Sequence, residues 1–211
     1  MNSVVAALAI AAAVGAESLP ARPGDDGPFL DPDASAAEII EACRTMVPPK
    51  VEIKGHINRR SRRGTTIAAY RFDLKRDGGI VELTVEDSDG KPVELEKGGR
   101  LLDTDITWSD LSLDYLWWKD VSFDRERESE SAQGVLCRVL LLRNGVREVR
   151  VWVDRRSGAM LQAEESAEGR VVRRLFCTSL KKFGGRWAPK NIEVGPPGAK
   201  YRTKIVVEEV I

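Results

Sequence analysis

The sequence predicts a mainly β protein of the α+β class, in which a curved antiparallel sheet forms a half-open barrel with an N-terminal helix and a short covering helix. From Val51 onward, turn signals such as Asp89-Gly90, Asn144-Gly145 and Ser157-Gly158 punctuate the chain, at roughly 10-residue spacing in its second half. Apolar and polar residues alternate between the turns, which gives each strand one apolar and one solvated face. A sheet of about eight or more such strands curls toward a barrel.

The composition fits a single domain. The chain has 211 residues, of which 42% are apolar and 31% are charged, and this length suffices to bury a real core. Lys and Arg together number 33, as do Asp and Glu, so the formal net charge is zero. Nucleic acid is therefore not expected as a partner, and any function that depends on charge must be local.

Residues 1–16 are predicted to be a signal peptide. An apolar run extends from Val4 to Val14, and Ala16 stands where a signal peptidase would cleave. The run is shorter than the roughly 20 apolar residues that cross a bilayer, so a stable anchor is not expected. The alternative is an Ala-rich N-terminal helix. Export predicts a periplasmic protein, with residues 17–33 as a linker and residues 34–211 as one domain.

One long helix is expected before the sheet, over AAEIIEACRTMV after Ser35. Ile39, Ile40 and Cys43 fall on one face of this helix, and Pro48-Pro49 ends it.

A second, short helix is expected within LLDTDITWSDLSLDYLWWKD, residues 101–120, which holds three of the five tryptophans. Asp105 or Ser109 is expected to cap it. Its apolar face would then consist of Trp108, Leu111, Tyr115 and Trp118, widened by Leu113, Leu116 and Trp117. So much apolar surface must cover something, and the open side of the curved sheet is the expected place. The alternative is that these side chains complete the core.

Three cysteines leave the redox state open. If an exported protein oxidises one pair, Cys137 and Cys177 are the expected partners because both lie in strand-like runs, and the odd count leaves at least one thiol.

The sequence predicts no catalytic residues, no metal site and no cofactor. His56 is the only histidine and has no Cys or carboxylate cluster near it in the sequence. The acidic residues Asp103, Asp105, Asp110 and Asp114 are expected to cap helices and face solvent. The stretch DRERESES, residues 124–131, is polar on both faces and is expected to be exposed. An enzyme is therefore not expected.

A basic hairpin tip is predicted at residues 58–64. It could attract anionic lipid headgroups or a partner, and a plain solvated loop is the alternative. The candidate residues are Arg59, Arg60, Arg62 and Arg63.

The chain also resembles the outer membrane lipoprotein-sorting (LolA-like) proteins of bacteria. The resemblance lies in the order of leader, helix and strands, in GGRLLDTDITWSDLSLDYLWW, and in VWVDRRSGAMLQAE and KKFGGRWAPKNIEV. It implies a half-open barrel whose concave face binds acyl chains of lipids or lipoproteins and carries them across the periplasm toward the outer membrane.

An apolar cavity with little catalytic machinery would suit that task, since hydrocarbon costs about 0.8 kcal/mol for each CH₂ left in water. Each candidate lining residue could equally be ordinary core. The candidates are Tyr70, Phe72, Val81, Leu83, Leu116, Trp117, Trp118, Leu140, Leu142, Val149, Val151, Val153, Leu161, Ile205 and Val207. The alternative function is a periplasmic interaction or sensor module of the same fold, with a protein partner instead of a lipid.

Overall fold

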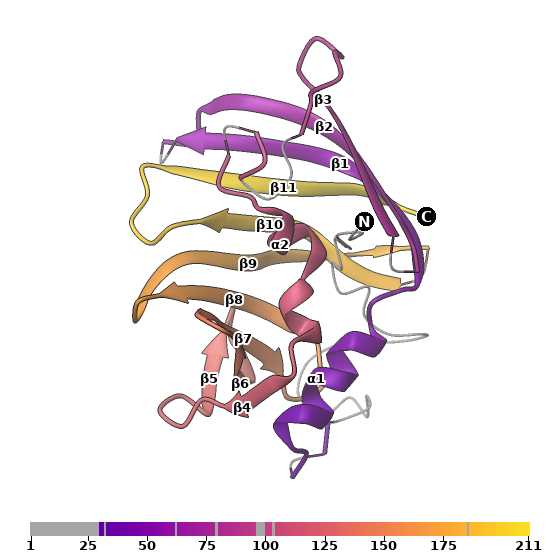
Figure 1. Ribbon diagram of the computed structural model, residues 1–211. Coiled ribbons are helices and arrows are strands. Elements are labelled where there is room, and N and C mark those ends of the chain that lie inside the picture. Colours follow the sequence, from indigo (N-terminus) through magenta and orange to yellow (C-terminus); the bar gives the residue numbers. More distant parts are fainter. Residues whose placement is uncertain are drawn as a thin grey trace.

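The protein is built around one antiparallel sheet of 11 strands that does not close on itself (Figure 1). The computed structural model describes residues 30–31, 33–61, 63–78, 80–95, 100–102, 104–184 and 186–211. The elements in chain order are α1 (Ala36–Thr45), β1 (Lys50–Ser61), β2 (Thr66–Asp77), β3 (Ile80–Glu86), α2 (Trp108–Ser112), the 3₁₀ helix η1 (Asp114–Trp117), β4 (Asp120–Phe123), β5 (Ser129–Ala132), β6 (Val135–Asn144), β7 (Arg147–Asp154), β8 (Met160–Ala167), β9 (Arg170–Phe183), β10 (Arg186–Gly195) and β11 (Tyr201–Val210).

The strand order is β3-β2-β1-β11-β10-β9-β8-β7-β6-β4, with β5 paired to β6. Two neighbouring pairs on this path are not consecutive in the chain: β1 pairs with β11, and β4 pairs with β6. The predicted mainly β, half-open fold is confirmed.

The predicted N-terminal helix is confirmed as α1. Ser35 and Glu38 form a capping box, in which the Ser35 hydroxyl accepts from the Glu38 backbone N–H and the Glu38 carboxylate accepts from the Ser35 backbone N–H. The buried face of α1 consists of Ala36, Ile39, Ile40 and Cys43. These side chains belong to the main core, so the helix closes one end of the curved sheet.

The period-two pattern places one face of the sheet in the main core. Along β7, Val149, Val151 and Val153 are buried in that core, whereas Trp152 packs into a smaller cluster on the opposite face. We call the face that carries the main core the inner face and the opposite one the outer face. The smaller outer cluster consists of Ala132, Cys137, Val139, Trp152, Ala159 and Leu161.

The predicted covering segment lies against the inner face, but it is not one helix. We call residues Thr104–Trp118 the cover. Thr107, and neither Asp105 nor Ser109, caps α2 through a capping box with Asp110. The helix ends after one turn because Leu113 adopts a left-handed backbone with φ 48° and ψ 36°, and η1 follows. In Figure 1 the cover crosses the middle of the sheet on the same side as α1.

The suggested Cys137–Cys177 disulfide is wrong for this structure, in which all three cysteines are free and buried. Cys137 lies on β6 and Cys177 on β9, with β7 and β8 between them. Three strand spacings separate these strands by about 14 Å, whereas a disulfide joins Cα atoms about 4.4–6.8 Å apart. Burial raises the pKa of Cys137 and of Cys177 to about 11 and that of Cys43 to about 12, so none is a reactive thiolate at neutral pH.

The predicted signal peptide, residues 1–16, and most of the predicted linker lie outside the described residues. In the part of the chain that the structure describes, no helix has both the length and the apolarity to span a membrane.

Candidate functional site

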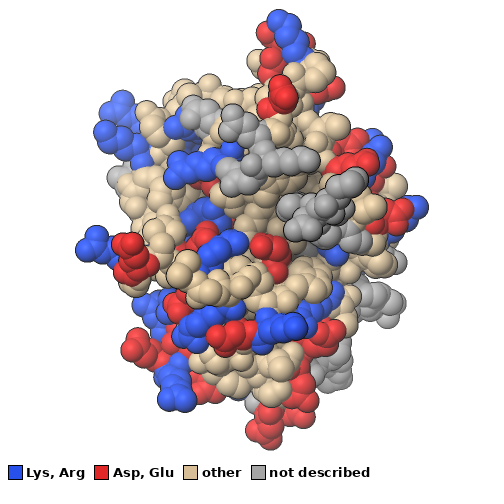
Figure 2. Space-filling model, in the orientation of Figure 1, with Lys and Arg blue, Asp and Glu red and all other residues tan. Residues whose placement is uncertain are grey.

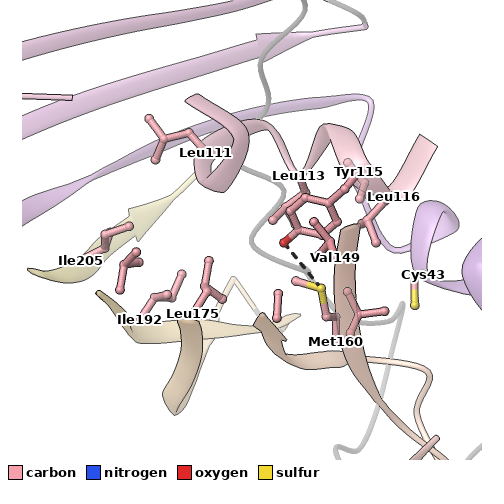
Figure 3. Packing of buried hydrophobic residues seen from close by; sticks show 14 of the residues in the cluster. Cys43, Leu111, Leu113, Tyr115, Leu116, Val149, Met160, Leu175, Ile192 and Ile205 are labelled. Atoms are coloured by element: carbon pink, nitrogen blue, oxygen red, sulfur yellow. Dashed lines mark hydrogen bonds between the residues drawn. The ribbon is translucent and has the colours of Figure 1, made fainter. Parts of the chain in front are cut away.

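The candidate site is the interface between the cover and the inner face of the sheet. Leu111, Leu113, Tyr115 and Leu116 are each no more than 4% exposed. In Figure 3 these side chains point from the cover toward Val149, Met160, Leu175, Ile192 and Ile205 of the strands. The cover therefore occupies the space that a ligand of the inner face would need.

Most of the predicted lining residues belong to the main core, which also includes the inward side chains of the cover. Ten of them are buried in the main core: Phe72, Leu116, Trp118, Leu140, Leu142, Val149, Val151, Val153, Ile205 and Val207. Tyr70, Val81 and Leu83 are partly buried and pack against that core near the β3 edge. These thirteen side chains thus belong to the core or to its margin.

Two predicted lining residues lie elsewhere. Trp117 is 43% exposed and lies under the Arg76 guanidinium, 5.6 Å from the ring centroid. Trp118, which the amphipathic spacing puts on the main apolar stripe, belongs to the core, whereas Trp117 at its margin does not. Leu161 belongs to the outer cluster, because a bulge pairs Trp152 with Gln162 and Val153 with Met160 and leaves Leu161 between them.

Tyr115 is the polar exception among the inward side chains of the cover. Its hydroxyl donates to the Met160 sulfur over 3.8 Å, a weak contact for a phenol that is 3% exposed. Burial raises the pKa of Tyr115 well above its ordinary value, so the phenol stays protonated. Its ring also packs edge-on against Trp118, with centroids 6.4 Å apart.

Charged side chains hold the cover on the sheet at one rim of the interface. We call Asp110 and Asp114 of the cover, with Arg147, Glu165 and Arg173 of β7, β8 and β9, the inner ion-pair cluster. Arg173 Nε lies 3.3 Å from Asp110 Oδ1, and Arg173 Nη2 lies 2.6 Å from Glu165 Oε2. Arg147 Nε lies 3.3 Å from Glu165 Oε1, and Arg147 Nη1 lies 3.6 Å from Asp114 Oδ2.

The sequence interpretation of Asp110 as a solvated cap was wrong in part. Its carboxylate does accept from the Thr107 backbone N–H over 2.8 Å, but the residue is 4% exposed. Burial raises the pKa of Asp110 above its ordinary value, against the opposing effects of Arg173 and of the Thr107 hydrogen bonds. The spacing of the acidic residues could not predict the ion pair with Arg173, because Arg173 lies on β9, more than sixty positions further along the chain.

A second set of contacts joins the cover to α1. Arg44 Nε donates to the Leu116 carbonyl oxygen over 2.7 Å, and Arg44 Nη2 donates to the Trp118 carbonyl oxygen over 3.3 Å. At the other end of the cover, the Asp105 backbone N–H donates to the Thr203 hydroxyl of β11 over 3.1 Å. The cover is thus attached mainly through polar contacts at its ends and edge, with apolar packing between.

Hollows bounded by described residues lie outside this interface. One of about 480 Å³ is lined by Arg60, Ser61, Gly64, Glu193, Arg202 and Lys204. A neighbouring hollow of about 390 Å³ shares Glu193 and Arg202 with it and extends along the β10–β11 turn.

Of the predicted headgroup residues, Arg60 lines the larger of these hollows. Arg60 and Arg63 are exposed, and the Arg59 guanidinium lies 4.8 Å from the centroid of the Tyr201 ring. Arg62 lies outside the described residues.

Among the described residues, no three His, Cys, Asp or Glu side chains are grouped so as to hold a metal ion. His56 Nε2 lies 3.1 Å from Glu208 Oε1 on the edge of another outer hollow.

The predicted segment 124–131 is not exposed throughout. Asp124 is 5% exposed and lies 2.5 Å from Arg150 Nε, with Glu164 and Arg174 alongside. We call these four residues the outer ion-pair cluster.

Comparison with known proteins shows the fold. No family model and no curated protein matches the chain. A LolA superfamily protein from Nitrosomonas europaea superposes with a TM-score of 0.63 at 15% identity, over 84% of this chain and 93% of that one. A DUF1329 family protein from Desulfovibrio piger superposes with a TM-score of 0.62 at 13% identity, over 83% of this chain and 90% of that one. A putative outer membrane lipoprotein-sorting protein domain from Vibrio parahaemolyticus superposes with a TM-score of 0.61 at 12% identity, over 83% of this chain and 91% of that one. The resemblance predicted from the sequence is confirmed at the level of the fold.

Proposed function

We propose that this protein binds the acyl chains of a lipid or lipoprotein between its inner sheet face and a displaced cover, and carries them across the periplasm toward the outer membrane. The observation that carries the proposal is that a separate segment, and not the sheet itself, closes a continuous apolar surface. The fold shared with a LolA superfamily protein and a lipoprotein-sorting domain supports the same reading.

Exchange of the cover for a ligand is energetically reasonable. An acyl chain regains about 0.8 kcal/mol for each CH₂ that leaves water, so a long chain matches the burial of several leucine-sized side chains. The cover's own apolar side chains would become exposed in the process, or would pack on the far side of the chain. The binding energy of the ligand therefore offsets the opening of the cover.

The construction of the cover supports such an opening. Leu113, at the joint between α2 and η1, holds a left-handed backbone that costs a branched residue about 1–3 kcal/mol. Leu102, just before the cover, has φ 58°. With one unfavourable backbone position within it and one just before it, we expect the cover to be less stable than the ladder beneath it.

Quenching of tryptophan fluorescence by a brominated acyl chain tests the proposal. Two single-tryptophan proteins are made by Trp→Phe substitution, one that keeps Trp118 and one that keeps Trp152, each checked for folding by circular dichroism. Trp118 belongs to the inner core and Trp152 to the outer cluster, and both are buried.

We expect 9,10-dibromostearate to quench Trp118 at micromolar concentration and to leave Trp152 unchanged, while unbrominated stearate quenches neither. Equal quenching of both would indicate non-specific adsorption. Absence of Trp118 quenching would show that the interior is a permanent core, and would leave the alternative of a protein partner on the same fold.

A further inference from the structure

The ends of β1 and β11 bring two basic stretches together at one end of the sheet. Their register places Arg60 of β1 opposite Arg202 of β11, and Ser61 opposite Tyr201. The turn between β1 and β2 and the turn between β10 and β11 therefore lie side by side, at the left of Figure 1. Blue side chains project from the corresponding edge of Figure 2.

Acidic residues are nearly absent there. From Ile57 to Phe72 and from Val194 to Val207, the sequence contains arginines and lysines but no Asp or Glu. Glu193 is the acidic residue that lines the shared hollows, and Arg202 Nη1 lies 3.2 Å from Glu193 Oε2. One carboxylate thus faces the three cationic side chains of the 480 Å³ hollow, Arg60, Arg202 and Lys204.

Such an arrangement lowers the stability of the isolated protein. Like charges directly opposite on neighbouring antiparallel strands repel each other. The repulsion is relieved when anions enter between them, and a hollow of about 480 Å³ has room for a phosphate group. Arg60, Gly64 and Arg202 at this hollow are exposed, so an anion can reach it from outside.

Apolar side chains beside the cations indicate how the anion is presented. Tyr201 is 39% exposed beneath Arg59, and Ile67 on the neighbouring strand β2 is 51% exposed. An amphipathic tyrosine among basic side chains is typical of the boundary between headgroups and water at a bilayer surface.

The other end of the same strands has the opposite character. The outer hollow there is lined by Asp73, Glu86, Glu208 and Glu209 together with Lys54, His56 and Arg71. The strands are therefore basic at one end and rich in carboxylates at the other, while the protein as a whole has no net charge. This polarity would orient the molecule at a negatively charged surface.

We propose that this basic end, formed by Arg60, Arg63, Tyr201, Arg202 and Lys204, docks on the anionic phospholipid headgroups of a membrane. Arg60, Arg202 and Lys204 of this docking surface lie on the outer face, Tyr201 lies at the same end with the inner-face parity of Thr203 and Ile205, and the surface is distinct from the acyl-chain site. It would bring one end of the half-barrel to the membrane from which, or to which, a lipid moves.

Co-sedimentation with vesicles tests the proposal. The wild-type protein is mixed with vesicles of phosphatidylcholine alone, or of phosphatidylcholine with 30% phosphatidylglycerol, at low and at 0.5 M salt. The test variant is Arg60→Glu with Arg202→Glu. The control is Lys91→Glu with Lys119→Glu, which makes the same change in net charge at exposed positions away from this end.

We expect binding to the phosphatidylglycerol vesicles alone, and its loss in 0.5 M salt. Each cationic side chain at a membrane surface contributes about fivefold to partitioning, so the test variant should bind at least about tenfold more weakly. The control should bind within about twofold of wild type. Equal binding by the test variant would overturn the proposal, as would binding of free glycerol phosphate or an acidic protein without any binding to vesicles.

The outcome is separable from that of the proposed function. Arg60→Glu with Arg202→Glu lies outside the inner core, so its single-Trp118 form should still be quenched by dibromostearate. Loss of vesicle binding with intact quenching supports both proposals independently, and intact vesicle binding without quenching retains the docking surface alone.

Discussion

Asp110 on the cover and Asp124 on the outer face are equally buried, with 4% and 5% of their surfaces exposed, and each pairs with an arginine of the sheet. Burial by itself would raise the pKa of both carboxyls. For Asp124 the hydrogen bonds from Arg150 and from the Glu126 backbone outweigh burial and lower the pKa, whereas for Asp110 burial prevails. The outer cluster is thus a site built for a carboxylate, while the inner cluster holds a carboxylate under strain.

Under the proposed function, this difference separates a contact that opens from one that stays closed. Asp124 loses its partners only if the sheet itself comes apart. Asp110 regains water whenever the cover lifts, and nothing in the sheet needs to change. The inner cluster therefore fits a reversible contact, and the outer cluster fits a permanent one.

The largest expected difference in the free energy of unfolding is between the replacement of Arg150 in the outer cluster and that of Arg173 in the inner cluster. Arg150→Leu leaves Asp124 and Glu164 buried beside an apolar side chain and should lower the free energy of unfolding by about 3–5 kcal/mol. Arg173→Leu should cost less than half as much, because the cover can open and rehydrate Asp110. Urea denaturation followed by circular dichroism measures both, with the exposed Arg125→Leu as control. Equal losses from the two substitutions would remove the distinction between the clusters.

Truncation of apolar side chains should show the same contrast on a smaller scale. Leu142→Ala, at a fully buried position near the end of β6, should cost about 3 kcal/mol of unfolding free energy. Leu116→Ala on the cover should lower the unfolding free energy by less, because the destabilisation cannot exceed the free energy of opening the cover locally. It should also increase the binding of a hydrophobic dye. Leu136→Ala, at a 50% exposed position, should change stability by no more than about 0.5 kcal/mol. A full-size loss at Leu116 without extra dye binding would show that the cover and the sheet unfold together.

The pH dependence should have opposite signs at the two aspartates. The raised pKa of Asp110 means that the folded state holds its proton more tightly, so stability falls as pH rises from the unfolded value, about 3.9, through the folded value. The lowered pKa of Asp124 means that its contribution is present above the unfolded value and is lost as pH falls through the folded value.

Urea denaturation between pH 3 and pH 7 checks these signs. Relative to wild type, Asp110→Asn should become more stable as pH rises, and Asp124→Asn should become less stable. Parallel pH profiles for the two variants would contradict the assignment.

The smallest effect is expected at Trp117. It is 43% exposed, so Trp117→Ser should lower the unfolding free energy by less than about 1 kcal/mol, although it removes the ring beneath Arg76. Trp118→Ser, at a 7% exposed position, should cost several times as much. Thermal denaturation of the two variants is a sufficient comparison, and similar losses would place both rings in the core.

The alternation of residues was enough to predict the sheet and most of its inner face. Val149, Val151 and Val153 face the core because a regular strand sends every second side chain to the same side. The prediction failed at Leu161, where a bulge shifts the alternation by one residue. No turn or glycine pattern within β8 marks that bulge in the sequence.

The cover was predicted as an element but not in its details. Its apolar side chains and its position over the sheet followed from amphipathic spacing. The left-handed Leu113 did not, because leucine at such a backbone position is set by tertiary packing and not by local preference. The ion pairs of Asp110 and Asp124 escaped prediction for a similar reason: their arginines lie on strands that only the folded sheet brings near.

Amide hydrogen exchange, measured with and without stearate, tests most directly whether the cover opens independently of the sheet. We expect the amides of Tyr115 and Leu116 to exchange through an opening of lower free energy than those of Val149 and Val151, and to exchange still faster when stearate holds the cover away. If the cover's amides exchange only with global unfolding and stearate leaves them unchanged, the cover is a fixed part of the core and the inner face binds no acyl chain.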